Sequence, residues 1–228
     1  MTDLLNGFQQ DVVPNVRWDR VWDATVETLY MMGVSILFTA IFGVILGILL
    51  YMTAEGNPWQ NQKLYRAVSA FVNIFRSIPF IILLILLVPI IRALLGSAIG
   101  AKTAIPALVI GAAPFYARLV EIGLREIPKG VVEAAKSMGA SNLQIIYKVL
   151  LPESKPALVS GITVTGIALI GYVAMAGLIG AGGLGHLAFM GYQRHQWDVI
   201  WISTINIIIM VQIFQMLGDF IVRKIDKR

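Results

Sequence analysis

Long stretches without a charged side chain constrain this chain more than any other feature of its sequence. Residues 28–54, 156–193 and 199–218 carry no charge, and these ranges hold 27, 38 and 20 residues. A helix needs about 20 apolar residues to cross the roughly 30 Å hydrocarbon layer of a bilayer. Two shorter uncharged ranges, 77–91 and 103–117, hold 15 residues each and need flanking turns to reach across. The chain is 57% apolar and 14% charged, which excludes an ordinary soluble domain.

These ranges predict an all-α, polytopic membrane protein with five transmembrane helices. The expected spans are 24–52, 66–91, 103–124, 156–177 and 199–222. An odd number of spans puts the two termini on opposite sides of the membrane. The loops and tail on one side hold 12 of the Lys and Arg residues, and those on the other side hold five. Because the cytoplasmic side is the more basic one, we predict an outside N-terminus and a cytoplasmic C-terminus. The net charge of +5 then reflects topology and needs no nucleic-acid partner.

Prolines interrupt the second and third predicted spans. Pro79 and Pro89 lie in the second span, and Pro106 and Pro114 lie in the third. Proline removes a helical hydrogen bond, so these helices are expected to be kinked or broken. Broken spans are tolerated where other helices or an aqueous cavity satisfy the freed carbonyl groups. They favour a translocation pathway over a scaffold that only anchors soluble partners.

The charged loop after the third predicted span begins with a helix. Pro128 suits its first turn, and Gly139 stands where a helix C-terminal glycine belongs, which predicts a helix over about 128–138. Ala134 and Ala135 would let another backbone approach closely. The alternative is that this helix packs only on its own bundle.

A second helix is predicted directly after the glycine turn. Ser141 and Gln144 have the spacing of a capping box. Apolar residues then recur at helical spacing until Pro152, where we expect the helix to end. The residues of this apolar stripe are Leu143, Ile146, Tyr147 and Leu150.

The order of residues in this loop resembles the signature of permease subunits in binding-protein-dependent ABC importers. Val149 stands where the signature has isoleucine. The likeness continues in FRSIPFIILL at 75–84 and AGLIGAGGLG at 176–185, and it is strongest to the methionine-import branch of the family. The positions that match the signature are Glu133, Ala134, Ala135, Gly139, Leu151 and Pro152.

This resemblance implies a single permease domain over residues 1–228, working as a homodimer in the bacterial cytoplasmic membrane. The loop 128–152, including Ser141, would be a coupling loop that docks on a dimer of separate ATPase subunits. Those subunits would bind ATP and Mg, so this chain would hold no cofactor and would not be an enzyme. A substrate-binding lipoprotein outside the membrane would deliver a small molecule, methionine in its L and D forms.

Polar residues inside the predicted spans are candidates to line the translocation path. For Arg76 the alternative is a side chain that extends from the lipid towards cytoplasmic water. Arg118, Glu121 and Arg125 are three and four residues apart and are expected to form local ion pairs. The candidate path residues are Asn73, Arg76, Ser77, Thr163, Thr165 and Asn206.

No pattern in the chain indicates a catalytic, nucleotide or metal site. Gly180, Gly182 and Gly185 match GxGxxG, but no βαβ unit surrounds them, so they predict a tight turn or re-entrant piece. His186 and His195 lack an acidic cluster of metal-ligand type. An alternative substrate is another amino acid or a small osmolyte. An ion-coupled secondary transporter would need a buried carboxylate or histidine at the membrane midplane, which no predicted span contains.

Overall fold

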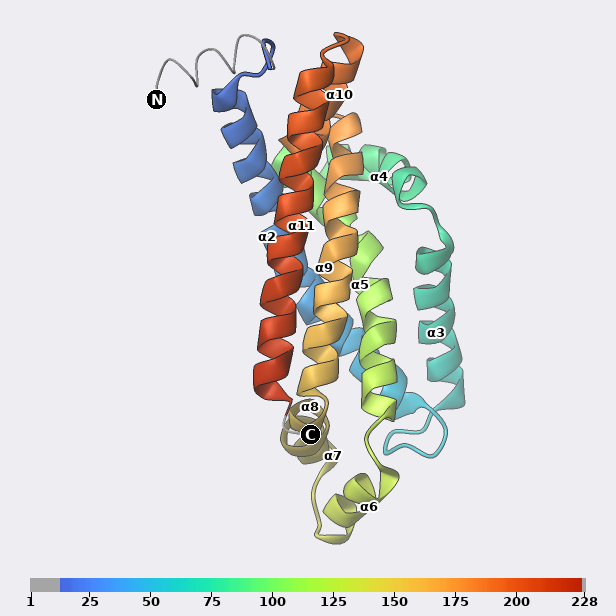
Figure 1. Cartoon of the computed structure of the whole chain (residues 1–228). Coiled ribbons are helices and arrows are strands. Elements are labelled where there is room, and N and C mark those ends of the chain that lie inside the picture. Colours follow the sequence, from blue (N-terminus) through green and yellow to red (C-terminus); the bar gives the residue numbers. More distant parts are fainter. Residues whose placement is uncertain (1–12, 227–228) are drawn as a thin grey trace. The chain divides into compact units, whose positions relative to one another are not determined.

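The computed structural model describes residues 13–226, which form helices and connecting turns without a strand. Figure 1 shows the helices with their labels. Their bounds are α2 Trp18–Thr53, α3 Gln62–Ser77, α4 Phe80–Leu95, α5 Ala101–Arg125, α6 Lys129–Ser137, α7 Asn142–Ile145, the π-helix η1 Ile146–Leu150, α8 Leu151–Glu153, α9 Lys155–Leu178, α10 Gly183–Gln193 and α11 Trp197–Ile225.

The chain divides into two compact units. The first unit contains Met1–Ser35, Phe80–Leu108 and Ile167–Phe214, and the second contains Ile36–Pro79, Val109–Gly166 and Gln215–Arg228. Helices α2, α5, α9 and α11 each contribute to both units.

Four helices in the described part of the chain are long and apolar enough to cross a membrane. They are α2, α5, α9 and α11, and α3 with α4 would add a fifth span as a bent pair. The fold class predicted from the sequence is therefore confirmed. The second predicted span, 66–91, is broken as expected, because the chain leaves helical geometry at Ile78.

Pro79 explains this break, whereas the other three prolines of the second and third predicted spans do not interrupt their helices. Ile78, which precedes Pro79, is extended with φ −80° and ψ 123°, because the proline ring disfavours helical geometry in the residue before it. Helix α4 continues through Pro89, and α5 continues through Pro106 and Pro114. The expected breaks at these three prolines are absent.

In the second unit, α2 and α5 approach closely at two glycines. A Cβ added at Gly43 would lie 3.1 Å from the Tyr116 Cβ, and one at Gly47 would lie 2.5 Å from the Val120 Cβ. The GxxxG motif of α2 therefore permits close helix contact. Beside this contact a buried cluster joins α2 and α5 to the loop helices through Tyr51, Met52, Tyr116, Val120, Leu124, Ile127, Val132, Ala135, Ile145, Ile146 and Leu150.

In the first unit, a glycine turn leads from α9 into α10. Gly180, Gly182 and Gly183 have φ of 92°, 88° and 74°, values that favour glycine. The predicted tight turn is present, whereas helix α10 was not predicted. Gly182, the N-cap of α10, has no side chain to accept a hydrogen bond, and two residues of α2 accept in its place. The Glu27 carboxylate accepts from the Gly183 N–H at 2.7 Å. The Thr28 hydroxyl accepts from the Leu184 N–H at 2.9 Å.

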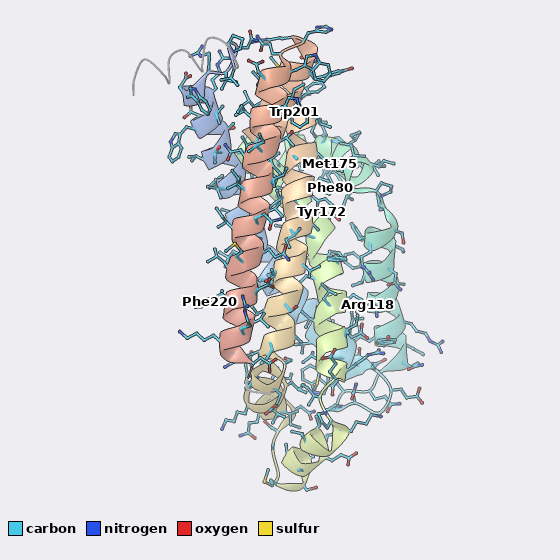
Figure 2. The ribbon with its side chains drawn as sticks, viewed as in Figure 1. Phe80, Arg118, Tyr172, Met175, Trp201 and Phe220 are labelled. Atoms are coloured by element: carbon cyan, nitrogen blue, oxygen red, sulfur yellow. The ribbon has the colours of Figure 1, made fainter. Side chains whose placement is uncertain are left out.

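An aromatic pair joins α4 and α9 in the first unit. The rings of Phe80 and Tyr172 stack with centroids 4.2 Å apart and an interplanar angle of 9°. Figure 2 shows the two side chains beside each other, with Met175 one turn further along α9. Phe80 directly follows the break at Pro79, so the stack holds the start of α4 against α9.

Candidate functional site

The loop helices α6 and α7 form the most specific feature of the second unit, and α6 ends in a Schellman motif. Met138 is the C-cap of α6, and Gly139 follows with φ 81°. The Gly139 N–H donates to the Lys136 carbonyl at 2.9 Å, and the Ala140 N–H donates to the Ala135 carbonyl at 3.0 Å. This is the bond pair that defines the motif. The predicted first helix and its glycine turn are therefore confirmed to within one residue at each end.

The second loop helix starts as predicted and ends one residue later than predicted, but it contains a π-helical turn. The Ser141 hydroxyl accepts from the Gln144 N–H, and the Gln144 side chain accepts from the Ser141 N–H at 2.8 Å, which completes the capping box. Helical structure runs from α7 through η1 into α8 and ends at Glu153, one residue after the expected end at Pro152. Pro152 falls in the first turn of α8 after the wide π-helical turn, where its missing N–H costs little.

The apolar stripe of this second helix is divided between the interior and the surface. Ile146 and Leu150 are buried in the cluster that includes α5, and Ile145 joins them there. Leu143 and Tyr147 are exposed, Tyr147 at 68%. The predicted stripe therefore has two buried and two exposed members.

Several apolar residues of the loop are individually exposed. Met138 at the end of α6 is 82% exposed, and Val131 in α6 is exposed as well. With Leu143 and Tyr147 they define what we call the loop patch. Of the two alanines expected to admit another backbone, Ala134 is exposed and Ala135 is buried in the chain's own cluster.

Charged and polar side chains link α3 to α5 in the same unit. Glu121 is only 1% exposed and binds Arg118 and Arg125, each with an N–O distance of 2.5 Å. The predicted local ion pairs are confirmed. Arg118 also donates to the Asn73 Oδ1 of α3 at 2.8 Å; Figure 2 labels Arg118 on the side of α5 that faces α3. Further bonds in this network involve Ser69 and Tyr65.

The sequence predicts the ion pairs of this network but not its bonds to α3. The spacing of Arg118, Glu121 and Arg125 indicates the ion pairs, but nothing in the sequence assigns them partners on α3. A weak signal exists, because Tyr65, Ser69 and Asn73 recur every four residues and so share one face of a helix. Glu121 is a buried carboxylate near the end of α5, and its two arginines neutralise it.

The candidate path residues have varied surroundings. Asn73 is bound by Arg118, and Ser77 donates to the Asn73 carbonyl at 2.7 Å. The Arg76 guanidinium lies 5.6 Å from the centroid of the Phe115 ring, a cation–π contact. Thr163 and Thr165 donate to carbonyls of their own helix, α9, and are buried. Asn206 lies on α11 in the first unit, whereas the other five residues lie in the second unit.

Membrane-length helices joined by a folded, partly apolar loop define a polytopic membrane protein. A family comparison names the class: residues 43–228 match the model of the "Binding-protein-dependent transport system inner membrane component". The chain belongs to this family. It is therefore a permease subunit of an ABC importer in the inner membrane and not itself an enzyme.

Relatives across nearly the whole length agree with this assignment. The chain is 58% identical over 216 residues to the methionine import system permease protein MetP of Bacillus subtilis, covering 94% of this chain and 97% of that protein. It is 47% identical over 212 residues to the probable D-methionine transport system permease protein MetI of Pasteurella multocida, covering 92% and 98%.

Solved structures give the same architecture. An inward-facing structure of the MetNI methionine ABC transporter matches with a TM-score of 0.87 and 47% identity, covering 91% of this chain and 97% of that one. An amino acid ABC transporter matches with a TM-score of 0.75 at 15% identity, covering 90% and 94%. The second likeness concerns the fold alone.

Proposed function

We propose that this chain is the permease subunit of an ATP-driven importer that carries methionine, in its L and D forms, across the bacterial cytoplasmic membrane. The observation that carries the substrate assignment is the 58% identity, over 94% of this chain, to a methionine import permease. In this proposal residues 1–228 form one permease domain, with the N-terminus outside and the C-terminus in the cytoplasm. Two copies form the path, and a binding lipoprotein delivers the substrate.

The loop 128–152 would couple the path to two ATPase subunits, which bind ATP and Mg. The loop patch supports this role, because it places exposed apolar side chains among charged ones outside the spans. Figure 1 shows α6 and α7 beyond the ends of α5 and α9 in the second unit. In this assignment α6 and the Schellman turn transmit the motion of the ATPase, and the buried cluster passes it to α5. The proposed coupling residues are Glu133, Ala134, Ala135, Gly139, Ser141, Leu151 and Pro152.

The path itself would be lined in part by polar residues of the spans. Arg76 and Ser77 are exposed on α3, and Asn206 is half-buried on α11. Thr163 and Thr165 bind their own helix and would contribute little beyond packing. The exposed residues are therefore the stronger candidates among those proposed from the sequence.

Reconstitution tests the proposed function. The chain, its ATPase and its binding protein are placed in liposomes, and uptake of labelled L-methionine and D-methionine is measured with ATP inside. We expect ATP-dependent uptake that unlabelled methionine suppresses and that histidine or glycine betaine does not. Uptake by this chain alone under an ion gradient, or ATP-driven uptake of only the competitors, would contradict the proposal.

Replacing Gly139 with valine should separate ATP hydrolysis from transport. No heavy atom lies within 4 Å of an added Cβ, but φ is 81°, a geometry that costs an L-residue about 1–2 kcal/mol. The turn between α6 and α7 would then rearrange, so uptake should fall while hydrolysis continues. Both rates are measured in the same liposomes.

Gly130 provides a matched control on the same helix. It also has no heavy atom within 4 Å of an added Cβ, and its backbone is not in the left-handed region. The Gly130→Val variant should therefore retain coupled transport. Equal ratios of transport to hydrolysis in the two variants would remove the Schellman turn from the coupling assignment.

A further inference from the structure

A second surface feature lies in the first unit, away from the loop helices. It is a pocket of about 190 Å³ between the start of α2, the end of α10 and the turn before α11. Val16, Val21 and Val199 are buried beneath it and form an apolar cluster. Its polar lining includes three arginines, Arg17, Arg20 and Arg194. The pocket therefore combines an apolar floor with a cationic rim.

Two of these arginines form no ion pair with the residues that the structure describes. Arg17 is paired with Asp19 at 2.6 Å. Asp198, the nearby acid at the start of α11, accepts from the Asn15 backbone N–H at 2.8 Å and from its side chain at 3.2 Å. Within residues 13–226 no ion pair involves Arg20 or Arg194, and both side chains are exposed. The rim thus presents two exposed guanidinium groups that are free to bind an anion.

Exposed tryptophans place this pocket at the membrane interface. Trp18 and Trp22 lie in the first turns of α2, and Trp197 and Trp201 lie in the first turns of α11; all four are exposed. Figure 1 shows the starts of α2 and α11 at the same end of this unit, and Figure 2 labels Trp201 there. Tryptophan is enriched at the level of the lipid headgroups. The pocket is therefore within reach of phospholipid phosphate groups.

We propose that this pocket binds the headgroup of an anionic phospholipid such as phosphatidylglycerol. The guanidinium groups of Arg20 and Arg194 bind the phosphate oxygens, since arginine matches a phosphate with paired, charge-assisted hydrogen bonds. The valine floor receives the first carbons of the acyl chains. A zwitterionic lipid binds less well, because its ammonium group faces the same two cations.

Native mass spectrometry of the full chain, purified with the subunits that copurify, tests this assignment. The protein is titrated separately with phosphatidylglycerol, phosphatidylcholine and inorganic phosphate, and retained adducts are counted. We expect phosphatidylglycerol to bind at lower concentrations than phosphatidylcholine. Each of the two arginines should contribute about a tenfold difference in these concentrations. The double variant Arg20→Gln, Arg194→Gln should lose this preference, and free phosphate should not displace the lipid.

Arg92→Gln is the matched control, because Arg92 is an exposed arginine of the same unit that does not line the pocket. It should keep the wild-type preference. An unchanged preference in the double variant would overturn the assignment, as would displacement by inorganic phosphate, which would indicate a site for free anions. If the double variant kept its lipid preference but no longer bound a substrate-binding protein, the assignment would also be overturned, because the arginines would then form a protein contact.

Discussion

Replacing Glu121 with alanine should lower the free energy of unfolding by about 3 kcal/mol or more. Its carboxylate is 1% exposed and holds Arg118 and Arg125. Arg118 is 19% exposed, so without Glu121 a largely buried cation keeps only neutral acceptors on α3. Removing one partner of a buried ion pair costs about 3–5 kcal/mol. We take the lower end because Arg125, 52% exposed, can turn to water. Denaturant titration in detergent measures the loss.

Glu126→Ala is the control for this measurement. Glu126 follows α5, is exposed and forms no salt bridge in the described part of the chain. Its removal should change stability by less than about 0.5 kcal/mol. Glu121→Gln should fall between the two variants, because it keeps one acceptor oxygen but loses the other acceptor and the charge. A Glu121→Ala variant as stable as Glu126→Ala would show that the network adds nothing to the α3–α5 contact.

Replacing Gly185 with alanine should disrupt the contact between α9 and α10. An added Cβ would lie 2.6 Å from the Ala174 Cα and 2.7 Å from the Ala174 carbonyl carbon, both backbone atoms. A backbone atom cannot move aside as a flexible side chain can. We therefore expect a destabilisation of about 3 kcal/mol, the upper end of the cost of overpacking. In a chain of this size that corresponds to a fall in Tm of roughly 6–12 °C.

Gly171→Ala, on α9, is the matched substitution. Nothing lies within 4 Å of its added Cβ, so alanine should be neutral or should stabilise the helix by up to about 1 kcal/mol. Thermal unfolding of both variants, purified in the same detergent, separates a steric effect from a general effect of losing glycine. Similar Tm values for the two would mean that α9 and α10 are less closely packed than this structure shows.

The contrast between the four prolines shows that a proline in the sequence does not by itself predict a break in a helix. Pro79 breaks the chain between α3 and α4, whereas Pro89, Pro106 and Pro114 lie inside continuous helices. The local cost of proline is similar at each position. Tertiary packing decides whether a helix continues through it, and that packing is not encoded in the neighbouring residues. The π-helical turn before Pro152 was likewise not predictable from the neighbouring residues.

Local interactions could be predicted because both partners lie within a few residues. The uncharged ranges located the helices α2, α5, α9 and α11, since length and apolarity alone decide whether a segment can cross a bilayer. The Schellman turn at Gly139 and the capping box at Ser141 were likewise predictable, because each closes within one helical turn.

Only the tertiary structure decided the interactions between residues far apart in the chain. Glu27 and Thr28 cap α10 from 156 residues away, which allows Gly182 to serve as its N-cap. Asn73 binds Arg118 across 45 residues. The division of the loop stripe, with Ile146 buried and Tyr147 exposed, has the same origin. Helical periodicity shows which residues share a face, but the neighbour that covers that face is determined by packing.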